Sequence, residues 1–441
     1  MTNTFNYGMF PITHWSTVGF DTMGPHTIAM WKDLGITLGI VPETKPEEKE
    51  AVLAFLDLVA ENGMKALIRD PRTAFMTYLA LKDEEAFRRG VKEAVKDFGS
   101  HPAIFGFYIG DEPNSAQRDA AFRASAIVRE EAPDLVPFLN FYPWNPVYGP
   151  IMSEYLQVSD LQTYLDSYVK ESNPAVISYD CYTACLGKTM TDSFNNHGIN
   201  DYFFNLHEFY LASKRHGVPF NTCINCFEHS WYRCTENDMR WQLSTAVACG
   251  ASMVTWFIIQ LSWVMDNWRN AAINHAGQRT ETFDRLARTN RMFIDYCGKI
   301  MPQLTIDECY HVNRAFGGFP LFEPFGNVLD VTCKDEWSKE DVPAIISRYH
   351  DADGRVYYGF CCVGETGWAT ANIRLKAGVT LERCQVNNRF EPCGLAVDTI
   401  TQEAVEGQNP QRLHINTYGG QFLLFREGLI PFSYRNRGES I

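Results

Sequence analysis

Short apolar runs alternate with amphipathic stretches from the start of the chain to about residue 305. An apolar run of strand length followed by a helical stretch is typical of a parallel βα unit. Eight such units close into a barrel, so the sequence predicts an α/β fold, a (β/α)8 TIM barrel, over residues 1–305. The predicted strands are Tyr7–Ile12, Thr37–Val41, Lys65–Ile68, Ile104–Ile109, Pro137–Phe141, Val176–Tyr179, Pro219–Phe227 and Met253–Ile259.

The stretches between the strands carry helical periodicity. Pro46–Asn62 is followed by Gly63, a common helix stop, and its apolar residues recur at a spacing that places them on one face. Asp83–Phe98 and Ser115–Glu131 show the same pattern. Such helices are expected to cover the outside of the barrel. The apolar face of the first helix comprises Val52, Phe55, Leu56 and Val59.

The pattern changes near Pro302, beyond a last predicted helix over residues 280–300. Ile345–Tyr349 and Val356–Phe360 flank the segment Asp351–Gly354, which has the composition of a hairpin turn. Later segments, such as Ala369–Leu375, are also short apolar runs of strand length. The sequence therefore predicts a second domain over residues 306–441, a C-terminal β-sandwich.

The net charge and the lack of a recognisable targeting signal limit the partners and the location that we expect for the chain. The 441 residues include 39 basic and 53 acidic side chains, a net charge of −14 with no basic block, so no nucleic-acid partner is expected. Met1–Trp15 lacks the charged and apolar regions of a signal peptide, and no uncharged apolar run is long enough to span a membrane. We therefore expect a cytoplasmic protein without a membrane partner.

Thirteen cysteines in such a chain are expected to be free thiols. Cys223-x-x-Cys226, with Cys181, Cys185 and Cys234 nearby, admits a zinc or redox interpretation. However, Cys223 and Cys226 lie in an apolar run, and no second pair of this spacing accompanies them. We interpret them as buried structural thiols and expect no cofactor.

Two adjacent carboxylates, Asp111 and Glu112, follow the apolar run Ile104–Ile109. Chemistry in a (β/α)8 barrel occurs where strands end and their loops begin. A buried carboxylate is unfavourable unless it is paired or neutral, and burial raises its pKa as a general acid requires. The alternative is that one of the two caps the helix that starts near Ser115.

Glu228 follows the seventh run, three strands after Glu112. The fourth and seventh strands lie across the barrel mouth from each other, which can bring two carboxyl groups to the separation of about 5 Å that suits a retaining glycosidase. The alternative is a structural ion pair between Glu228 and Arg233.

These residues resemble clan A glycoside hydrolases, and within the clan they are most similar to the family 42 β-galactosidase-like enzymes. The segments Val176–Tyr182, Gly250–Gln260 and Tyr296–Pro302 resemble the clan's sixth strand, eighth strand and closing helix. The resemblance implies that Tyr182 orients the nucleophile and that Trp256 forms an aromatic platform for the sugar.

The implied reaction is a double displacement. Glu228 attacks the anomeric carbon while Glu112 protonates the leaving oxygen, and Glu112 then acts as base for water. The sequence departs from the clan at Asp111, where the clan has an Asn that contacts the substrate 2-hydroxyl. An Asp there can still accept a hydrogen bond, and its charge would raise the pKa of Glu112.

Other strand ends offer further pocket residues. His14 or Arg69 could bind sugar hydroxyls, Asn140 could contact the substrate, and Trp15 and Trp144 are predicted pocket walls. Tyr142 also follows the fifth run. Trp231 and Trp263 are candidates for a leaving-group subsite.

The sequence is also compatible with two other functions. A metal-dependent barrel enzyme would use His14, Asp70, Asp180 and His229 as ligands, although the clustered pair that such sites contain is missing. A barrel that binds carbohydrate without cleaving it would have the same kind of pocket but would not catalyse hydrolysis.

Within the hydrolase interpretation, the expected substrate is a small carbohydrate. We expect an exo-acting enzyme that removes one terminal, galactoside-like sugar. The oligomeric state stays open, and the resemblance favours a homo-oligomer, a dimer or trimer.

Overall fold

The computed structural model describes residues 7–144, 149–186, 193–229, 232–364, 367–397 and 411–428. The chain forms two compact units, residues 1–239 with 251–294, and residues 240–250 with 295–441. The first contains a TIM barrel and the second contains the antiparallel sheets of a β-sandwich, so the predicted fold class is confirmed.

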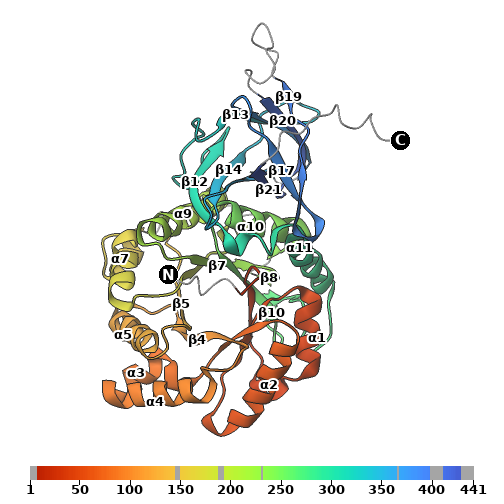
Figure 1. The fold of residues 1–441 in the computed structure, drawn as a ribbon. Coiled ribbons are helices and arrows are strands. Elements are labelled where there is room, and N and C mark those ends of the chain that lie inside the picture. Colours follow the sequence, from red (N-terminus) through yellow and green to blue (C-terminus); the bar gives the residue numbers. More distant parts are fainter. Residues whose placement is uncertain are drawn as a thin grey trace. The chain divides into compact units, whose positions relative to one another are not determined.

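Eight parallel strands form the wall of the barrel in the order β1-β10-β7-β6-β5-β4-β3-β2 (Figure 1). The two end strands, β1 and β2, also approach each other. The backbone N–H of Thr37, next to the start of β2, donates to the carbonyl of Ile12 in β1 at 3.0 Å. The strands are β1 (Ile12–Ser16), β2 (Leu38–Val41), β3 (Lys65–Ile68), β4 (Ile104–Asp111), β5 (Val136–Phe141), β6 (Ile177–Asp180), β7 (Phe220–Asn225) and β10 (Met253–Gln260).

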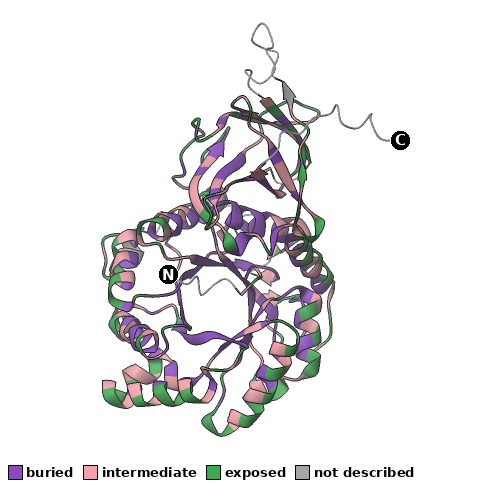
Figure 2. Ribbon diagram, viewed as in Figure 1, coloured by how far each residue is buried: buried purple, intermediate pink, exposed green. Residues whose placement is uncertain are grey.

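Amphipathic helices surround this wall. Figure 2 shows their buried sides turned to the strands and their exposed sides turned outward. The four apolar residues predicted to share a face of α2 are all buried, which confirms that face. The helices of the first unit are α1 (Pro25–Leu34), α2 (Lys49–Glu61), α3 (Phe75–Leu81), α4 (Glu84–Phe98), α5 (Ser115–Glu131), α6 (Gly149–Leu156), α7 (Leu161–Ser172), α8 (Thr183–Leu186), α9 (Ser193–His216) and, for most of its length, α11 (Glu281–Cys297). Most of α10 (Glu236–Ala248) belongs to the second unit.

The first strand lies later in the chain than the pattern predicts. The structure places β1 at Ile12–Ser16, so His14 and Trp15 lie inside the strand and do not follow it. Successive side chains of a strand point to opposite faces. His14 and Trp15 must therefore face different sides of the barrel wall.

The second unit contains a six-stranded sheet, β12-β14-β15-β21-β17-β18, and a four-stranded sheet, β13-β16-β20-β19. Apolar side chains such as Phe360 and Ile373 form its core. The predicted hairpin is confirmed, since β14 pairs antiparallel with β15. The strands are β12 (Thr305–Val312), β13 (Val328–Asp335), β14 (Ala344–His350), β15 (Val356–Cys362), β16 (Trp368–Leu375), β17 (Leu381–Gln385), β18 (Arg389–Pro392), β19 (Ala396–Val397), β20 (Gln411–Tyr418) and β21 (Phe422–Glu427).

The thirteen cysteines all lie in the described part of the chain and are free thiols. Cys223 and Cys226 are buried, and the Cys226 thiol donates to the carbonyl of Ile258. Within the described residues, no helix combines the length and the apolar character needed to cross a membrane.

Candidate active site

The end of β4 carries the two predicted carboxylates. Glu112 has a φ of 44°, an uncommon backbone conformation for a residue other than glycine, and its N–H donates to the carbonyl of Asn140 at 2.9 Å. Such strain is tolerated where surrounding structure enforces it, often at functional sites. Asn114 caps α5, because its side chain accepts from the backbone N–H groups of the first turn. The alternative that Asp111 or Glu112 caps this helix is therefore wrong.

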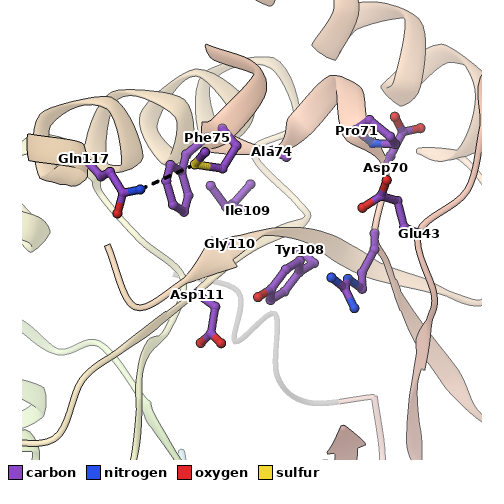
Figure 3. A pocket seen from close by; sticks show the side chains of 12 residues that line it. Glu43, Asp70, Pro71, Ala74, Phe75, Tyr108, Ile109, Gly110, Asp111 and Gln117 are labelled. Atoms are coloured by element: carbon purple, nitrogen blue, oxygen red, sulfur yellow. Dashed lines mark hydrogen bonds between the residues drawn. The ribbon is translucent and has the colours of Figure 1, made fainter. Parts of the chain in front are cut away.

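A bulge in β4 sets the direction of Asp111. The pairing register with β5 shifts between Tyr108 and Gly110, so one extra residue enters β4 there. Tyr108 and Asp111, three residues apart, consequently lie on the same side of the strand, whereas Ile109 and Phe75 lie on the other (Figure 3). A Cβ at Gly110 would lie 2.2 Å from the Phe75 ring, so only glycine fits.

Asn140 on β5 joins two carboxylates beneath the mouth. Its side chain is buried, and its amide nitrogen donates to Asp111 Oδ1 at 3.0 Å and to Asp180 Oδ1 at 3.2 Å. Asp180 ends β6 and is 7% exposed. The predicted site residues Asp111 and Asn140 are thus brought together, and Asp180 joins them.

A buried hydrogen-bond chain fixes the orientation of the Asn140 amide. Thr255 Oγ donates to Asn221 Oδ1 at 3.1 Å, Asn221 Nδ2 donates to Ser178 Oγ at 2.9 Å, and Ser178 Oγ donates to Asn140 Oδ1 at 2.8 Å. Because Ser178 already accepts from Asn221, its hydroxyl proton points to Asn140. The Asn140 nitrogen must then face the carboxylates. Such chains rigidify a buried site when every member is satisfied.

Burial raises the pKa of all three carboxyl groups, and neighbouring negative charge adds to the shifts of Glu112 and Asp180. Burial and the negative charge of Asp111 raise the pKa of Glu112 to about 7, against the effect of side-chain hydrogen bonds to Tyr142 and Asp180. Burial and the charges of Glu112 and Asp111 raise the pKa of Asp180 well above its ordinary value. Although Asp111 is exposed, the protein around the mouth desolvates its carboxylate, which raises its pKa. A proton is thus available near neutral pH, as general acid catalysis requires.

Aromatic rings and one arginine line the adjoining wall. Trp15 contacts Tyr108 edge to face with ring centroids 5.3 Å apart, and the Arg69 guanidinium lies 5.0 Å from the Tyr108 ring and 5.9 Å from the Trp15 ring. Arg69 and Tyr108 border a pocket of about 310 Å³ that reaches Asp111 (Figure 3). The predicted residues Trp15 and Arg69 therefore lie together near Asp111. The other lining residues are Glu43, Asp70, Pro71, Ala74, Phe75, Met76, Ile109, Gly110 and Gln117.

Glu228 lies in a short strand beyond β7, β8 (Glu228–His229), which pairs with β11 (Trp268–Arg269) and β9 (Tyr232–Arg233). Its carboxylate, 13% exposed, forms an ion pair with Arg269 and accepts a hydrogen bond from Asn270. The alternative of an ion pair between Glu228 and Arg233 is wrong, since Arg233 pairs with Glu281 and Glu228 pairs with Arg269.

Tyr182 does not orient Glu228 in this structure. Its hydroxyl donates to Cys223 Sγ at 3.6 Å, and its ring stacks on Phe257 at 4.9 Å. In the described part of the chain, the partners of the Glu228 carboxylate are Arg269 and Asn270. Tyr182 and Glu228 are thus not joined, although His229 contacts the Tyr182 ring edge to face.

Trp256 is not at the mouth. It is fully buried, and its indole N–H donates to Asn290 of α11 at 2.9 Å, so it packs between the wall and the helices. The prediction that Trp256 forms a platform for the sugar is therefore wrong. Phe257 is the partly exposed aromatic, and it packs with Phe227 and Trp268 at the strand end.

His14 and Trp144 are both buried. His14 is buried against Trp31 of α1, and burial lowers its pKa to about 3, so the prediction that it binds sugar hydroxyls is wrong. Trp144 is 7% exposed, and its backbone is bound at both N–H and carbonyl by Asn205 of α9. Trp263 is half exposed, and Trp231 lies outside the described residues.

The described residues contain no group of three or more His, Cys, Asp or Glu side chains arranged to hold a metal ion. Of the four candidate ligands, Asp70 is paired with Arg72 at 2.7 Å, and His14 faces the helix layer. The set proposed for a metal-dependent barrel is therefore not assembled.

Sequence reasoning missed Tyr108 and gave Asp180 no part in the hydrolase site. Tyr108 alternates with Gly106 along β4, and this two-residue period could have placed it inside the barrel. Asp180 ends β6 as Asp111 ends β4, so inspection of every strand end could have paired them. The bulge that brings Tyr108 and Asp111 to one side has no clear sequence signal beyond Gly110.

Solved structures share this architecture over most of the chain. A glycoside hydrolase matches 95% of this chain and 91% of its own, with a TM-score of 0.52 and 8% identity. A glycoside hydrolase family 5 protein from Bacteroides vulgatus matches 95% of this chain and 89% of its own, with a TM-score of 0.52 and 9% identity. The fold is shared with glycoside hydrolases.

A weaker similarity, with a TM-score of 0.48 and 11% identity, covers 64% of this chain and 59% of a β-galactosidase from the psychrophilic Marinomonas ef1. The chain thus spans less than two thirds of that β-galactosidase. By sequence, it matches no protein-family model and no curated protein. At these identities the likeness to solved structures concerns the fold, and function must be argued from the site.

Proposed function

We propose that the protein is a retaining glycoside hydrolase with Glu112 as its general acid/base. One observation carries this proposal: Glu112 directly follows β4 and is held by the Asn140 carbonyl, next to the Asp111 and Asp180 carboxyl groups that the Asn140 amide links. Burial and the charge of Asp111, which raise the pKa of Glu112 to about 7, support it. The shared fold supports the reaction class. The closer resemblance to family 42 enzymes remains a prediction.

Glu228 is the proposed nucleophile. Its ion pair with Arg269 requires the carboxylate form, which is the form that attacks. In the first step a bond forms between a Glu228 oxygen and the anomeric carbon, the glycosidic C–O bond breaks, and Glu112 gives its proton to the leaving oxygen. In the second step Glu112 takes a proton from water, whose oxygen displaces Glu228 and releases the sugar.

The proposed substrate is a terminal sugar of a small glycoside. Asp111 can accept a hydrogen bond from a sugar hydroxyl, and its carboxylate is oriented by Asn140. Trp15 and Tyr108 offer apolar ring surface of the kind on which sugars stack. We propose exo-action on one terminal sugar; the pocket of about 310 Å³ is lined by Asp111 but not by Glu112 or Glu228, so it would hold only a part of the substrate away from the cleaved bond.

A panel of nitrophenyl glycosides, pyranose and furanose in both anomers, tests the proposal. We expect the wild type to hydrolyse one of them, and Glu112→Ala to lower kcat/KM by at least about a hundredfold. The matched control, Glu93→Ala, removes an exposed carboxylate of α4 and should keep wild-type activity. Hydrolysis that survives in Glu112→Ala would overturn the assignment.

Sugar binding without cleavage is the second candidate function. It is favoured by one observation, that Arg269 and Asn270 hold the Glu228 carboxylate while Tyr182 contacts Cys223 instead. Saturable binding of a glycoside in calorimetry, with no turnover by wild-type protein, would select this function.

A further inference from the structure

A second pocket, of about 330 Å³, lies at the rim of the barrel beside the start of α1. Its walls come from the loop after β1, from the first turns of α1 and from two segments at and beyond the end of β10. The carboxyl ends of parallel barrel strands share one face, so this pocket lies at the same end of the barrel as Asp111. The two pockets have no lining residue in common.

Hydrogen bonds within the protein fix the walls of this second pocket. The N–H of Thr17, after β1, donates to the carbonyl of Gln260 at 3.2 Å, and its hydroxyl oxygen accepts from the N–H of Ser262 at 2.8 Å. On the opposite wall, Asn274 Oδ1 accepts from the N–H of Ala276 at 3.0 Å. The pocket is therefore formed without a ligand, which lowers the ordering cost of binding.

The polar lining excludes an ionised ligand. None of the described residues that line this pocket is Asp, Glu, Lys or Arg. A charged ligand would lose its water without gaining an opposite charge, which is unfavourable. The polar side chains are hydroxyls, an amide and imidazoles, groups that can each donate and accept hydrogen bonds. They are Thr22, His26, Thr27, Gln260, Ser262 and His275.

The rest of the lining favours a ligand that is both polar and apolar. Its apolar side chains are Val18, Met23, Met30 and Ile273. A purely apolar ligand would leave the polar groups unpaired, whereas a sugar carries hydroxyl groups around a ring with apolar C–H surface. The side chain of Gln260, half-buried at the end of β10, has no hydrogen-bond partner among the described residues, so its amide is available to such a ligand.

We propose that this pocket is a second carbohydrate site, which binds a neutral sugar unit apart from the residues of the proposed reaction. The neutral, hydroxyl-rich character of the ligand follows from the lining. The choice of a sugar rests on the proposed function, in which glycosides reach the same end of the barrel. Neither Glu112 nor Glu228 lines the pocket, so binding here requires neither catalytic carboxylate.

Histidine NMR tests this binding without turnover. In full-length Glu112→Ala protein with isotope-labelled histidine, His26→Gln and His275→Gln assign the ring signals of His26 and His275. We expect a neutral methyl glycoside of galactose, glucose or mannose to shift both signals saturably at a constant pH of about 8, with one dissociation constant. Galacturonate and galactosamine should bind at least about tenfold more weakly. Equal binding of the charged sugars would overturn the proposal.

Two substitutions locate the bound sugar. Ala276→Trp fills the pocket from its exposed rim and should abolish both shifts, whereas the control Ala54→Trp, at an exposed position of α2, should leave them unchanged. Gln260→Ala should weaken binding by about three- to tenfold through the loss of one hydrogen bond. Shifts that persist in Ala276→Trp, or no shift with any neutral glycoside, would overturn the proposal.

The same data distinguish this site from the proposed function. Glycoside hydrolysis by the wild type without shifts of His26 and His275 would reject the second site alone. Saturable shifts in a protein that cleaves no glycoside would support the second site and reject only the proposed reaction.

Discussion

A carboxylic acid that must hold its proton near neutral pH needs a dry surrounding or a neighbour of like charge, and Glu112 has both. Burial and Asp111 raise its pKa, while hydrogen bonds to Tyr142 and Asp180 act against them. The charge of Asp111 thus has a physical effect at this site, because it raises the pKa of Glu112. Asp111 tunes Glu112 in addition to any contact that it makes with the substrate.

Asp111→Asn should shift the pH profile to lower pH. Glu112 must be protonated in the first step, so activity falls as pH rises through its pKa. Removing the charge of Asp111 lowers that pKa, and we expect the alkaline limb of kcat/KM to move down by about one unit. The control Asp119→Asn changes an exposed carboxylate of α5 and should leave the profile unchanged. An upward shift in Asp111→Asn would contradict this electrostatic role.

Glu112→Gln should stabilise the folded protein at alkaline pH. The pKa of Glu112 is 4.5 in the unfolded chain and is raised to about 7 in the folded protein. The folded protein therefore loses stability as the pH rises through this interval, because ionisation of Glu112 is unfavourable in the folded state. We expect the free energy of unfolding to increase by about 1–3 kcal/mol at pH 8 and by less at pH 5, from urea denaturation. An equal gain at both pH values would reject the electrostatic explanation.

Elements place these side chains through local backbone features. The bulge in β4 turns Asp111 to the side of Tyr108, and Gly110 leaves room for the Phe75 ring of α3. The end of β4 is therefore held by contact with the helix that covers it. The position of Asp111 therefore depends on this packing.

Gly110→Ala should destabilise the barrel and lower activity together. Its Cβ would lie 2.2 Å from Phe75, and overpacking of this kind costs about 1–3 kcal/mol. Gly90→Ala in α4 is the matched control, because a Cβ there makes ordinary contact with Arg72 and alanine favours helix. Thermal unfolding followed by circular dichroism measures both. A Gly110→Ala protein as stable as Gly90→Ala would contradict the packing argument.

Strand periodicity predicts the barrel well because eight buried strands leave long apolar runs. It fails at β1, which spans Ile12–Ser16, so that His14 and Trp15 lie within the strand and do not follow it. A shift of one residue along the strand then decides which side chain faces the barrel interior. The same one-residue ambiguity separates Trp256 from Phe257 on β10. Strand ends predicted Asp111 and Glu112, whereas the contacts of Glu228 come from Arg269 in the two-residue strand β11 and from Asn270 after it, and a strand this short has no periodicity to read.

At the scale of the whole molecule, the proposed chemistry lies within the first unit. Glu112, Asp180, Glu228 and Arg269 all belong to residues 1–239 and 251–294. The β-sandwich supplies none of the residues assigned to the reaction. The two carboxylates proposed to act on one glycosidic bond come from β4 and from the segment after β7, so the barrel must bring distant parts of the sequence to a common substrate.

Azide rescue tests the central claim most directly, because it separates the two catalytic roles by product. With an activated substrate, we expect azide to restore turnover in Glu112→Ala with a glycosyl azide of retained configuration, and in Glu228→Ala with one of inverted configuration. NMR of the isolated azides gives the configuration. An inverted azide from Glu112→Ala, or full wild-type hydrolysis by either variant without azide, would contradict the assignment of Glu112 as acid/base and Glu228 as nucleophile.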